Sequence, residues 1–398
     1  MTEIGGIKQQ LEELLAEPLA SVRSRENSAL ERLLASTNGR VVLFGAGNLG
    51  RRALSCLQRI GISPLAFSDN NSRLWNSMID GCPVVCPGDA ASRFGADALF
   101  VVAIWNAGHY YGDTKRRLIE RGCKHITSVS SIYWHFHSEF LPFFCQDLPH
   151  KLYQDADHVI AAAPLFSDYQ SRQIYLSQIR WRALGEWDSF VRPDCEESYF
   201  PESIFSLLPN EGFVDCGAFD GDTVRSFLAR QGPNFDSILA IEADALTFSK
   251  LQTFIDGLDP AIKPKISSLN VAVAAERGTI RFTASGGVDS RISETGTSNV
   301  ECFALDELLQ ARRASYIKLD IEGAEYDALK GAVRTMRRDR PVLSVCVYHT
   351  QHDIWRLPLF IQQKAEDYMF FLREHEGDGW QTVLYAVPVE RVRSSKLT

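Results

Sequence analysis

The stretch Phe213-Val214-Asp215-Cys216-Gly217-Ala218-Phe219-Asp220-Gly221-Asp222-Thr223-Val224 decides the fold of the second half of the chain. It reads as a short buried strand, a glycine turn and the start of a helix. Gly217 and Gly221 lack side chains where a ligand must approach the backbone, and the helix directs its amide groups at whatever occupies the turn. The next strand, 237–241, ends at Glu242. An acid at this point suits a ribose diol, because a carboxylate accepts both hydroxyl protons.

The spacing of this turn differs from that of a dinucleotide fingerprint. Phe219 stands where the middle glycine of G-x-G-x-x-G is expected, and the residues fit D-x-G-x-x-x-G, a spacing typical of a turn that binds S-adenosylmethionine. A second strand and turn occupy 317–325, and we expect a helix over 326–334. Both turns therefore predict a ligand site at the carboxyl ends of parallel strands.

The chain from Phe213 to about Pro388 resembles the FkbM family of S-adenosylmethionine-dependent methyltransferases. The blocks that carry the resemblance are 213–224, 240–242, 270–273, 305–308, 317–325 and 329–332. The resemblance implies a seven-stranded class I methyltransferase sheet closed by an antiparallel hairpin, with S-adenosylmethionine as the cofactor. The cofactor residues expected from the turn, the strand ends and this resemblance are Asp215, Gly217, Ala218, Asp220, Gly221, Asp222, Thr223, Glu242, Ala243, Val271, Ala272 and Asp320. Family members often carry Asn-Ile in place of Phe219 and Asp220, so no role is transferred to Phe219.

Composition narrows the class of protein. The 398 residues carry a net charge of −8 without a lysine- or arginine-rich tract, which argues against a nucleic-acid substrate. Nine cysteines, an odd number spread over the whole length, favour a reduced intracellular protein. The N-terminus lacks the features of a signal peptide, and no apolar run approaches the ~20 residues of a membrane helix. We therefore expect a cytoplasmic protein that binds a small molecule and no membrane.

A length of 398 residues predicts two domains. We expect an α/β protein in which two doubly wound Rossmann-like domains are joined by a helical connector. The expected divisions are N-terminal helices at 1–38, a Rossmann-like domain at 39–132, the connector at 133–205 and the methyltransferase domain at 206–398. The N-terminal helices are candidates for packing on the next domain or on another subunit of a homo-oligomer. The aromatic-rich connector forms either a packed core or a lid over the methyltransferase cleft.

The first domain contains its own ligand motif. Residues 45–50 match G-x-G-x-x-G between a strand at 41–44 and a helix, and Asp69 follows the next strand at about the ~20-residue spacing of a ribose-binding acid. The domain also resembles the nucleotide-sugar-binding domains of sugar-modifying enzymes. A nucleotide or nucleotide-sugar site is therefore predicted at Gly45, Gly47, Gly50 and Asp69. The alternative is that the glycines serve packing alone and Asp69 caps a turn.

The acceptor half of the predicted cleft collects Asp320, Glu322 and His349 at strand ends. His349 is the first candidate for the general base because the pKa of a free histidine is near neutral, and Asp353 is the candidate to orient it. Asp320 is the rival base. Alternatively, Asp320, Glu322 and His349 bind Mg²⁺ or Mn²⁺, which would polarise the acceptor oxygen. The two acids could also only shape their turn, and His349 could be a packed or capping residue.

The sequence predicts an O-methyltransferase that acts on a sugar, a nucleotide-linked sugar or a secondary-metabolite hydroxyl. The loop 285–298 is a candidate acceptor-side flap, and its Arg291 would suit a carboxylate or phosphate. One alternative is an oxidoreductase that binds a dinucleotide at 45–50. The other is a non-enzymatic nucleotide-sugar-binding module with a degenerate methyltransferase domain. Asp215 and Glu242, together with the glycines of the turn, argue against degeneracy.

Overall fold

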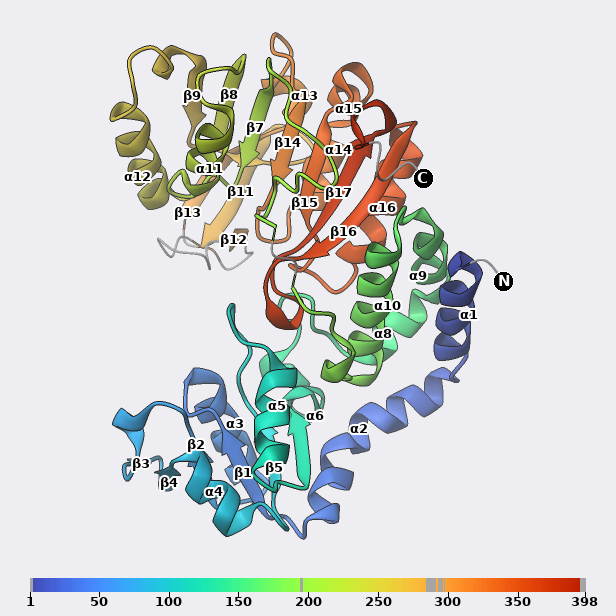
Figure 1. Ribbon diagram of the computed structural model, residues 1–398, viewed down its shortest axis with the longest axis vertical. Coiled ribbons are helices and arrows are strands. Elements are labelled where there is room, and N and C mark those ends of the chain that lie inside the picture. Colours follow the sequence, from blue (N-terminus) through green and yellow to red (C-terminus); the bar gives the residue numbers. More distant parts are fainter. Residues whose placement is uncertain (1–2, 194–195, 284–290, 293–295, 297, 394–398) are drawn as a thin grey trace.

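The computed structural model describes residues 3–193, 196–283, 291–292, 296 and 298–393. Two α/β sheets occupy opposite ends of the molecule, and a group of helices lies beside and between them (Figure 1). The predicted α/β class is confirmed. Of the helices in these residues, none is both long and apolar enough to cross a membrane.

The first sheet has six strands in the order β3-β4-β2-β1-β5-β6. Its strands are β1 Val41–Phe44, β2 Ala66–Ser68, β3 Met78–Ile79, β4 Cys82–Val85, β5 Leu99–Val102 and β6 His125–Ser128. All pairs are parallel except β3 with β4. β1 and β5 are buried along their whole length, as expected for parallel strands covered on both faces. The helices of this part are α3 Asn48–Arg59, α4 Pro87–Phe94 and α5 Tyr111–Glu120.

The N-terminal helices pack on the connector of the same chain. These helices are α1 Glu3–Leu15 and α2 Leu19–Ser36, and those of the connector are α6 Ser130–His135, α7 His137–Phe140, α8 Pro149–Gln154, α9 Ala156–Ala162 and α10 Tyr169–Leu184. α1 lies against α9 and α10, whereas α2 lies against α6 and α8. His150 Nδ1 lies 2.6 Å from Glu26 Oε1, so a buried polar pair joins α2 to α8.

The second sheet has seven strands in the order β16-β17-β15-β14-β7-β8-β9. The strands are β7 Gly212–Cys216, β8 Ser237–Ile241, β9 Ile266–Leu269, β14 Tyr316–Leu319, β15 Val342–Cys346, β16 Tyr368–Glu374 and β17 Thr382–Pro388. β17 pairs antiparallel with both β15 and β16, and the other pairs are parallel. The predicted seven-stranded sheet with its antiparallel hairpin is confirmed. Its helices are α11 Asp222–Gln231, α12 Ala245–Asp256, α13 Leu305–Leu308, α14 Glu325–Lys330, α15 Val333–Asp339 and α16 Asp353–Lys364.

One local prediction is corrected. The helix expected over 326–334 is divided into α14 and α15 at Gly331, where a Cβ would lie 2.3 Å from the carbonyl oxygen of Ala274. Beside the seven-stranded sheet, a four-stranded sheet is formed by β10 Ala272–Val273, β11 Gly278–Thr283, β12 Arg291–Ile292 and β13 Ser298–Phe303. Most of the predicted flap 285–298 lies outside the described residues, as does the side chain of Arg291.

The turn between β16 and β17 docks on the first sheet. Trp105, just after β5, donates its indole N–H to the carbonyl oxygen of Asp378 at 3.0 Å, and His109 Nδ1 lies 2.9 Å from Asp378 Oδ2. The Gly108 N–H also bonds Glu376 Oε2 at 2.9 Å. Figure 1 shows this turn reaching from the second sheet toward the first. The carboxyl end of β5 therefore faces the methyltransferase-like half of the chain.

Candidate active site

A cavity of about 260 Å³ opens at the carboxyl ends of β7, β8 and β14. The predicted cofactor residues that line it are Gly217, Asp222, Thr223, Glu242, Ala243, Val271, Ala272 and Asp320. The other four lie beside it. Asp215 pairs with Lys318 beneath the turn, and Asp220 pairs with Arg225 at its outer side. Ala218 and Gly221 pack inside the turn.

The two glycines of the turn make room for protein atoms. A Cβ on Gly217 would lie 1.8 Å from the carbonyl oxygen of Asp320, and φ at Gly217 is +79°. A Cβ on Gly221 would lie 2.6 Å from Phe254 Cδ1. Both glycines therefore have a packing role in addition to the ligand approach expected from the sequence, and Gly217 also lines the cavity. Because Gly217 has no side chain, the turn after β7 can lie directly against Asp320, which follows the end of β14.

Glu242 holds the turn after β7 through its carboxylate. Its Oε2 accepts from the Phe219 N–H and its Oε1 from the Asp244 N–H, both at 2.8 Å. Burial raises the pKa of Glu242, whereas these two hydrogen bonds act to lower it. Phe219, to which no role was assigned from the sequence, lines the cavity and has φ +48°.

A buried ion pair supports the floor of the cavity. Lys318 Nζ lies 3.1 Å from Asp215 Oδ1 and donates to the Gly217 carbonyl oxygen at 2.7 Å. Burial raises the pKa of Asp215 to about 7, although the nearby ammonium opposes the shift. For Lys318, burial alone would lower the pKa, but the carboxylates of Asp215 and Asp320 raise it. Lys318 was missed from the sequence, although a lysine within a buried central strand is itself a signal.

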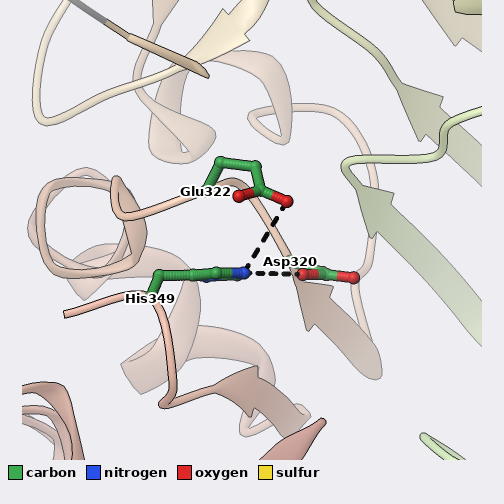
Figure 2. Close-up of side chains that lie close together, drawn as sticks. All are labelled: Asp320, Glu322 and His349. Carbon is green, nitrogen blue, oxygen red and sulfur yellow. Dashed lines mark ion pairs between the residues drawn. The ribbon is translucent and has the colours of Figure 1, made fainter. Parts of the chain in front are cut away.

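Asp320, Glu322 and His349 lie close together at the ends of their strands (Figure 2). His349 Nε2 lies 3.4 Å from Asp320 Oδ1 and 3.8 Å from Glu322 Oε1. Both His349 Nε2 and Asp320 Oδ1 are buried and have no hydrogen-bond partner within the described parts of the chain. Glu322 adopts φ +55°, an uncommon value for a residue with a side chain, and this backbone turns its carboxylate toward His349.

Glu325 orients His349, in place of the predicted Asp353. Glu325 Oε1 lies 2.8 Å from His349 Nδ1 and also accepts from the Ile321 N–H, whereas Oε2 accepts from the Gly323 N–H. Asp353 instead accepts from the Thr350 N–H at 3.1 Å and closes the loop after β15. Burial alone would lower the pKa of His349, but the surrounding carboxylates raise it to about 10.

Tyr199 of the connector also reaches the site. Its hydroxyl donates to Asp320 Oδ2 at 2.8 Å, so this oxygen is occupied while Oδ1 faces His349. The backbone of Tyr199 has φ +71°, and its N–H bonds the Tyr385 hydroxyl. One tyrosine among many aromatic connector residues gave no sequence signal for this contact.

The predicted nucleotide residues of the first sheet form a similar turn. Asp69 Oδ2 accepts from the Ala46 N–H and Oδ1 from the Asn71 N–H, both at 2.7 Å, much as Glu242 binds its own turn. A Cβ on Gly50 would lie 1.9 Å from the Gly45 carbonyl oxygen, so Gly50 is required for packing. Gly47 has no heavy atom within 4 Å of its Cβ position.

Comparisons with known proteins agree with this geometry. Residues 215–376 match the family described as Methyltransferase FkbM domain, and no curated protein matches the chain. The fold is similar to that of methyltransferase FkbM from Methylobacillus flagellatus KT, with 18% identity and a TM-score of 0.74 over 96% of this chain and 99% of that one. An rRNA methylase from Streptococcus thermophilus is also similar, with 12% identity and a TM-score of 0.30 over 46% of this chain and 89% of that one. The chain thus contains an FkbM methyltransferase domain at residues 215–376 and is a methyltransferase of a kind that uses S-adenosylmethionine.

Proposed function

We propose that the protein transfers the methyl group of S-adenosylmethionine to a hydroxyl oxygen of a small molecule, such as a sugar, a nucleotide-linked sugar or a secondary metabolite. The observation that carries the proposal is the position of Asp320 and Glu322. Both line the cavity at the cofactor turn, and both face His349. Methyl transfer needs the acceptor oxygen aligned with the sulfonium methyl and relieved of its proton. Asp320 and Glu322 would contact both the cofactor and the acceptor, and could therefore help both to align the acceptor oxygen and to remove its proton.

The cofactor is proposed to lie along the turn after β7. Glu242 would accept from the ribose hydroxyls, and the amino-acid part would lie near Asp222 and Gly217, which line the same cavity. Replacing Glu242 with alanine is expected to weaken S-adenosylmethionine binding by ~1.5–3 kcal/mol, the value of a charged hydrogen bond. Titration calorimetry measures the change, and Glu276→Ala, outside the cavity, is the control. Unchanged affinity of the Glu242 variant would place the ribose elsewhere.

Asp320, Glu322 and His349 fit a divalent cation. The two carboxylates suit Mg²⁺ or Mn²⁺, and the imidazole suits a transition metal, which favours Mn²⁺ of the two. Separations of 3.4 and 3.8 Å are shorter than twice a metal–ligand distance of ~2.1 Å, so one ion can reach both pairs. Glu325 on Nδ1 is the outer partner that a metal-binding histidine usually has. A bound cation would polarise the acceptor oxygen and lower the pKa of its hydroxyl. His349 would then be a ligand and not the base.

The experiment that tests the function is a methylation assay with radiolabelled S-adenosylmethionine, Mg²⁺ and a panel of sugars, nucleotide sugars and phenols. Incorporation of label into one class supports the proposal. A parallel assay that follows the oxidation of NADH tests the oxidoreductase alternative. Binding of a nucleotide sugar without binding of S-adenosylmethionine would instead support the non-enzymatic module.

A nucleotide or nucleotide sugar is proposed as a ligand of the first sheet, because Gly47 leaves open space beside the N-terminus of α3. The full-length protein is expected to show a higher melting temperature with such a ligand, and Gly47→Val is expected to remove the shift. Differential scanning fluorimetry with UDP, UDP-glucose and NADH measures it, with S-adenosylhomocysteine as the control for the other sheet. If no nucleotide stabilises the protein, the glycines serve packing alone.

A further inference from the structure

A second cavity, of about 420 Å³, lies next to the Asp320, Glu322 and His349 cluster. The connector segment 142–147 contributes one side, and the loop 349–352 after β15 contributes the other. Glu322 lines this cavity and the cofactor cavity alike. A molecule in the second cavity would therefore meet the cluster that the cofactor cavity also reaches.

The connector presents an aromatic wall to this cavity. Phe143 and Gln146 exchange two backbone hydrogen bonds of 3.0 Å, which close a tight turn. Phe144 within the turn has φ +48° and is half-buried, with its ring 4.9 Å from that of Trp380. A left-handed backbone is unfavourable for phenylalanine, and such residues concentrate at ligand sites. The turn thus holds a flat apolar surface where a ring compound can stack.

The opposite wall carries unused hydrogen-bonding groups. Thr350 Oγ1 and Gln351 Nε2 are buried without a hydrogen-bond partner in the described chain, and both residues line the cavity. Their backbone is fixed, because the Thr350 N–H bonds Asp353 and the Gln351 carbonyl oxygen accepts from Arg182. Buried polar groups are costly when left unpaired. Both atoms are enclosed by protein, so they would meet the hydroxyl groups of a ligand after their side chains rotate toward the cavity.

The side chains that line the cavity are unfavourable for an anionic ligand. Among the described residues that line it there is no lysine or arginine, and Asp147 adds a carboxylate. Burial lowers the pKa of His352, which disfavours a positive charge on its ring. His349 is the other group among these lining residues that can carry a positive charge, and Glu325, Asp320 and Glu322 already face it, so a phosphate or carboxylate would gain little there.

We propose that this cavity binds the methyl acceptor, and that the acceptor is an uncharged ring with two adjacent hydroxyls. The inference rests on the proposed function, since the diol must face Asp320, Glu322 and His349. Asp320, Glu322 and His349 would hold a divalent cation through one atom each, and such a cation would have room to bind both oxygens of a diol. One hydroxyl oxygen forms the new bond to the methyl carbon as the carbon–sulfur bond breaks, giving S-adenosylhomocysteine, and the hydroxyl proton leaves to solvent. Sugars and catechols share this chemistry.

Binding can be measured without turnover, because Trp380 and Trp105 lie within 4.9 and 6.2 Å of the Phe144 ring. Tryptophan fluorescence is recorded with S-adenosylhomocysteine and Mg²⁺ present. Methyl mannoside and catechol are the diol probes, and phenol and mannose 6-phosphate are their matched controls. At least one diol probe is expected to bind tenfold or more tightly than its control. The probe that binds shows whether the acceptor is a sugar or a catechol. Equal binding of each pair would overturn the inference.

Variants separate the acceptor site from the methyltransferase function. Gln351→Leu and Phe144→Leu are each expected to weaken diol binding at least tenfold and to leave S-adenosylmethionine and Mn²⁺ affinities unchanged. Gln363→Leu and Phe136→Leu, outside the cavity, are the matched controls and should bind the diol normally. If Phe144→Leu fails to fold, Gln351→Leu alone decides. Normal diol binding by a folded Gln351→Leu protein would overturn the assignment of this cavity. If the wild-type protein does not bind S-adenosylmethionine, the proposed function itself is overturned.

Discussion

Replacing His349 with alanine is expected to lower the methyl transfer rate roughly a thousandfold and to leave S-adenosylmethionine affinity unchanged. His349 does not line the cofactor cavity, so cofactor binding has no direct need of it. Its Nε2 faces Asp320 and Glu322, so its loss would remove one of the three proposed metal ligands. A cation at an acceptor oxygen is worth several kcal/mol of transition-state stabilisation, which corresponds to about this factor in rate. The measurements are single-turnover methylation and calorimetry with S-adenosylmethionine.

Metal dependence is tested with the same preparations. Chelation should abolish turnover of the wild type, and added Mg²⁺ or Mn²⁺ should restore it. Asp320→Ala and Glu322→Ala should be as damaging as His349→Ala, and all three should lose Mn²⁺ binding in electron paramagnetic resonance. His158→Ala, an exposed histidine on α9, is the control. Near-normal turnover by His349→Ala would rule out both roles for this residue and make Asp320 the candidate base.

Replacing Lys318 with methionine is expected to destabilise the protein by ~3–5 kcal/mol, because the Asp215 carboxylate is left buried without its partner. Burial already raises the pKa of Asp215 to about 7, and loss of the ammonium would raise it further. A folded-state pKa above the unfolded value means that stability is retained at low pH and is lost as pH rises through the folded pKa. The variant should therefore lose more stability at pH 9 than at pH 6. Urea unfolding at both pH values measures the difference.

The control for this prediction is an ion pair on the surface. Lys263 lies 2.7 Å from Asp256, and both side chains are exposed, so Lys263→Met should cost less than ~1 kcal/mol. Asp215→Asn introduced into the Lys318→Met protein should recover part of the lost stability and remove its dependence on pH. A loss below ~1 kcal/mol for Lys318→Met would mean that water or protonation compensates the buried Asp215 carboxylate.

The fold was largely readable from local sequence. The strand predicted at 237–241 matches β8 to the residue, because buried parallel strands bounded by turns are distinctive. The break between α14 and α15 was not readable. It depends on the approach of Ala274 to Gly331, which are far apart in the sequence.

The candidate site was readable only in part, for the same reason. Asp320, Glu322 and His349 follow strands, so topology alone brings them to one edge of the sheet. The residues that orient these side chains were not predicted. Glu325 contacts His349 Nδ1, and Tyr199 of the connector donates a hydrogen bond to Asp320. Such contacts depend on side-chain packing between distant segments, which one sequence does not reveal.

The tight turn at 143–146 has a consequence for how new substrates can arise. Its aromatic wall is encoded outside the FkbM domain at 215–376, whereas the residues that line the cofactor cavity lie almost entirely within it. Insertions or exchanges in the connector can therefore reshape the choice of acceptor while the cofactor chemistry stays intact. Selection can act on the two properties separately, and exchanging the segment 141–147 between related enzymes offers a direct route to altered products.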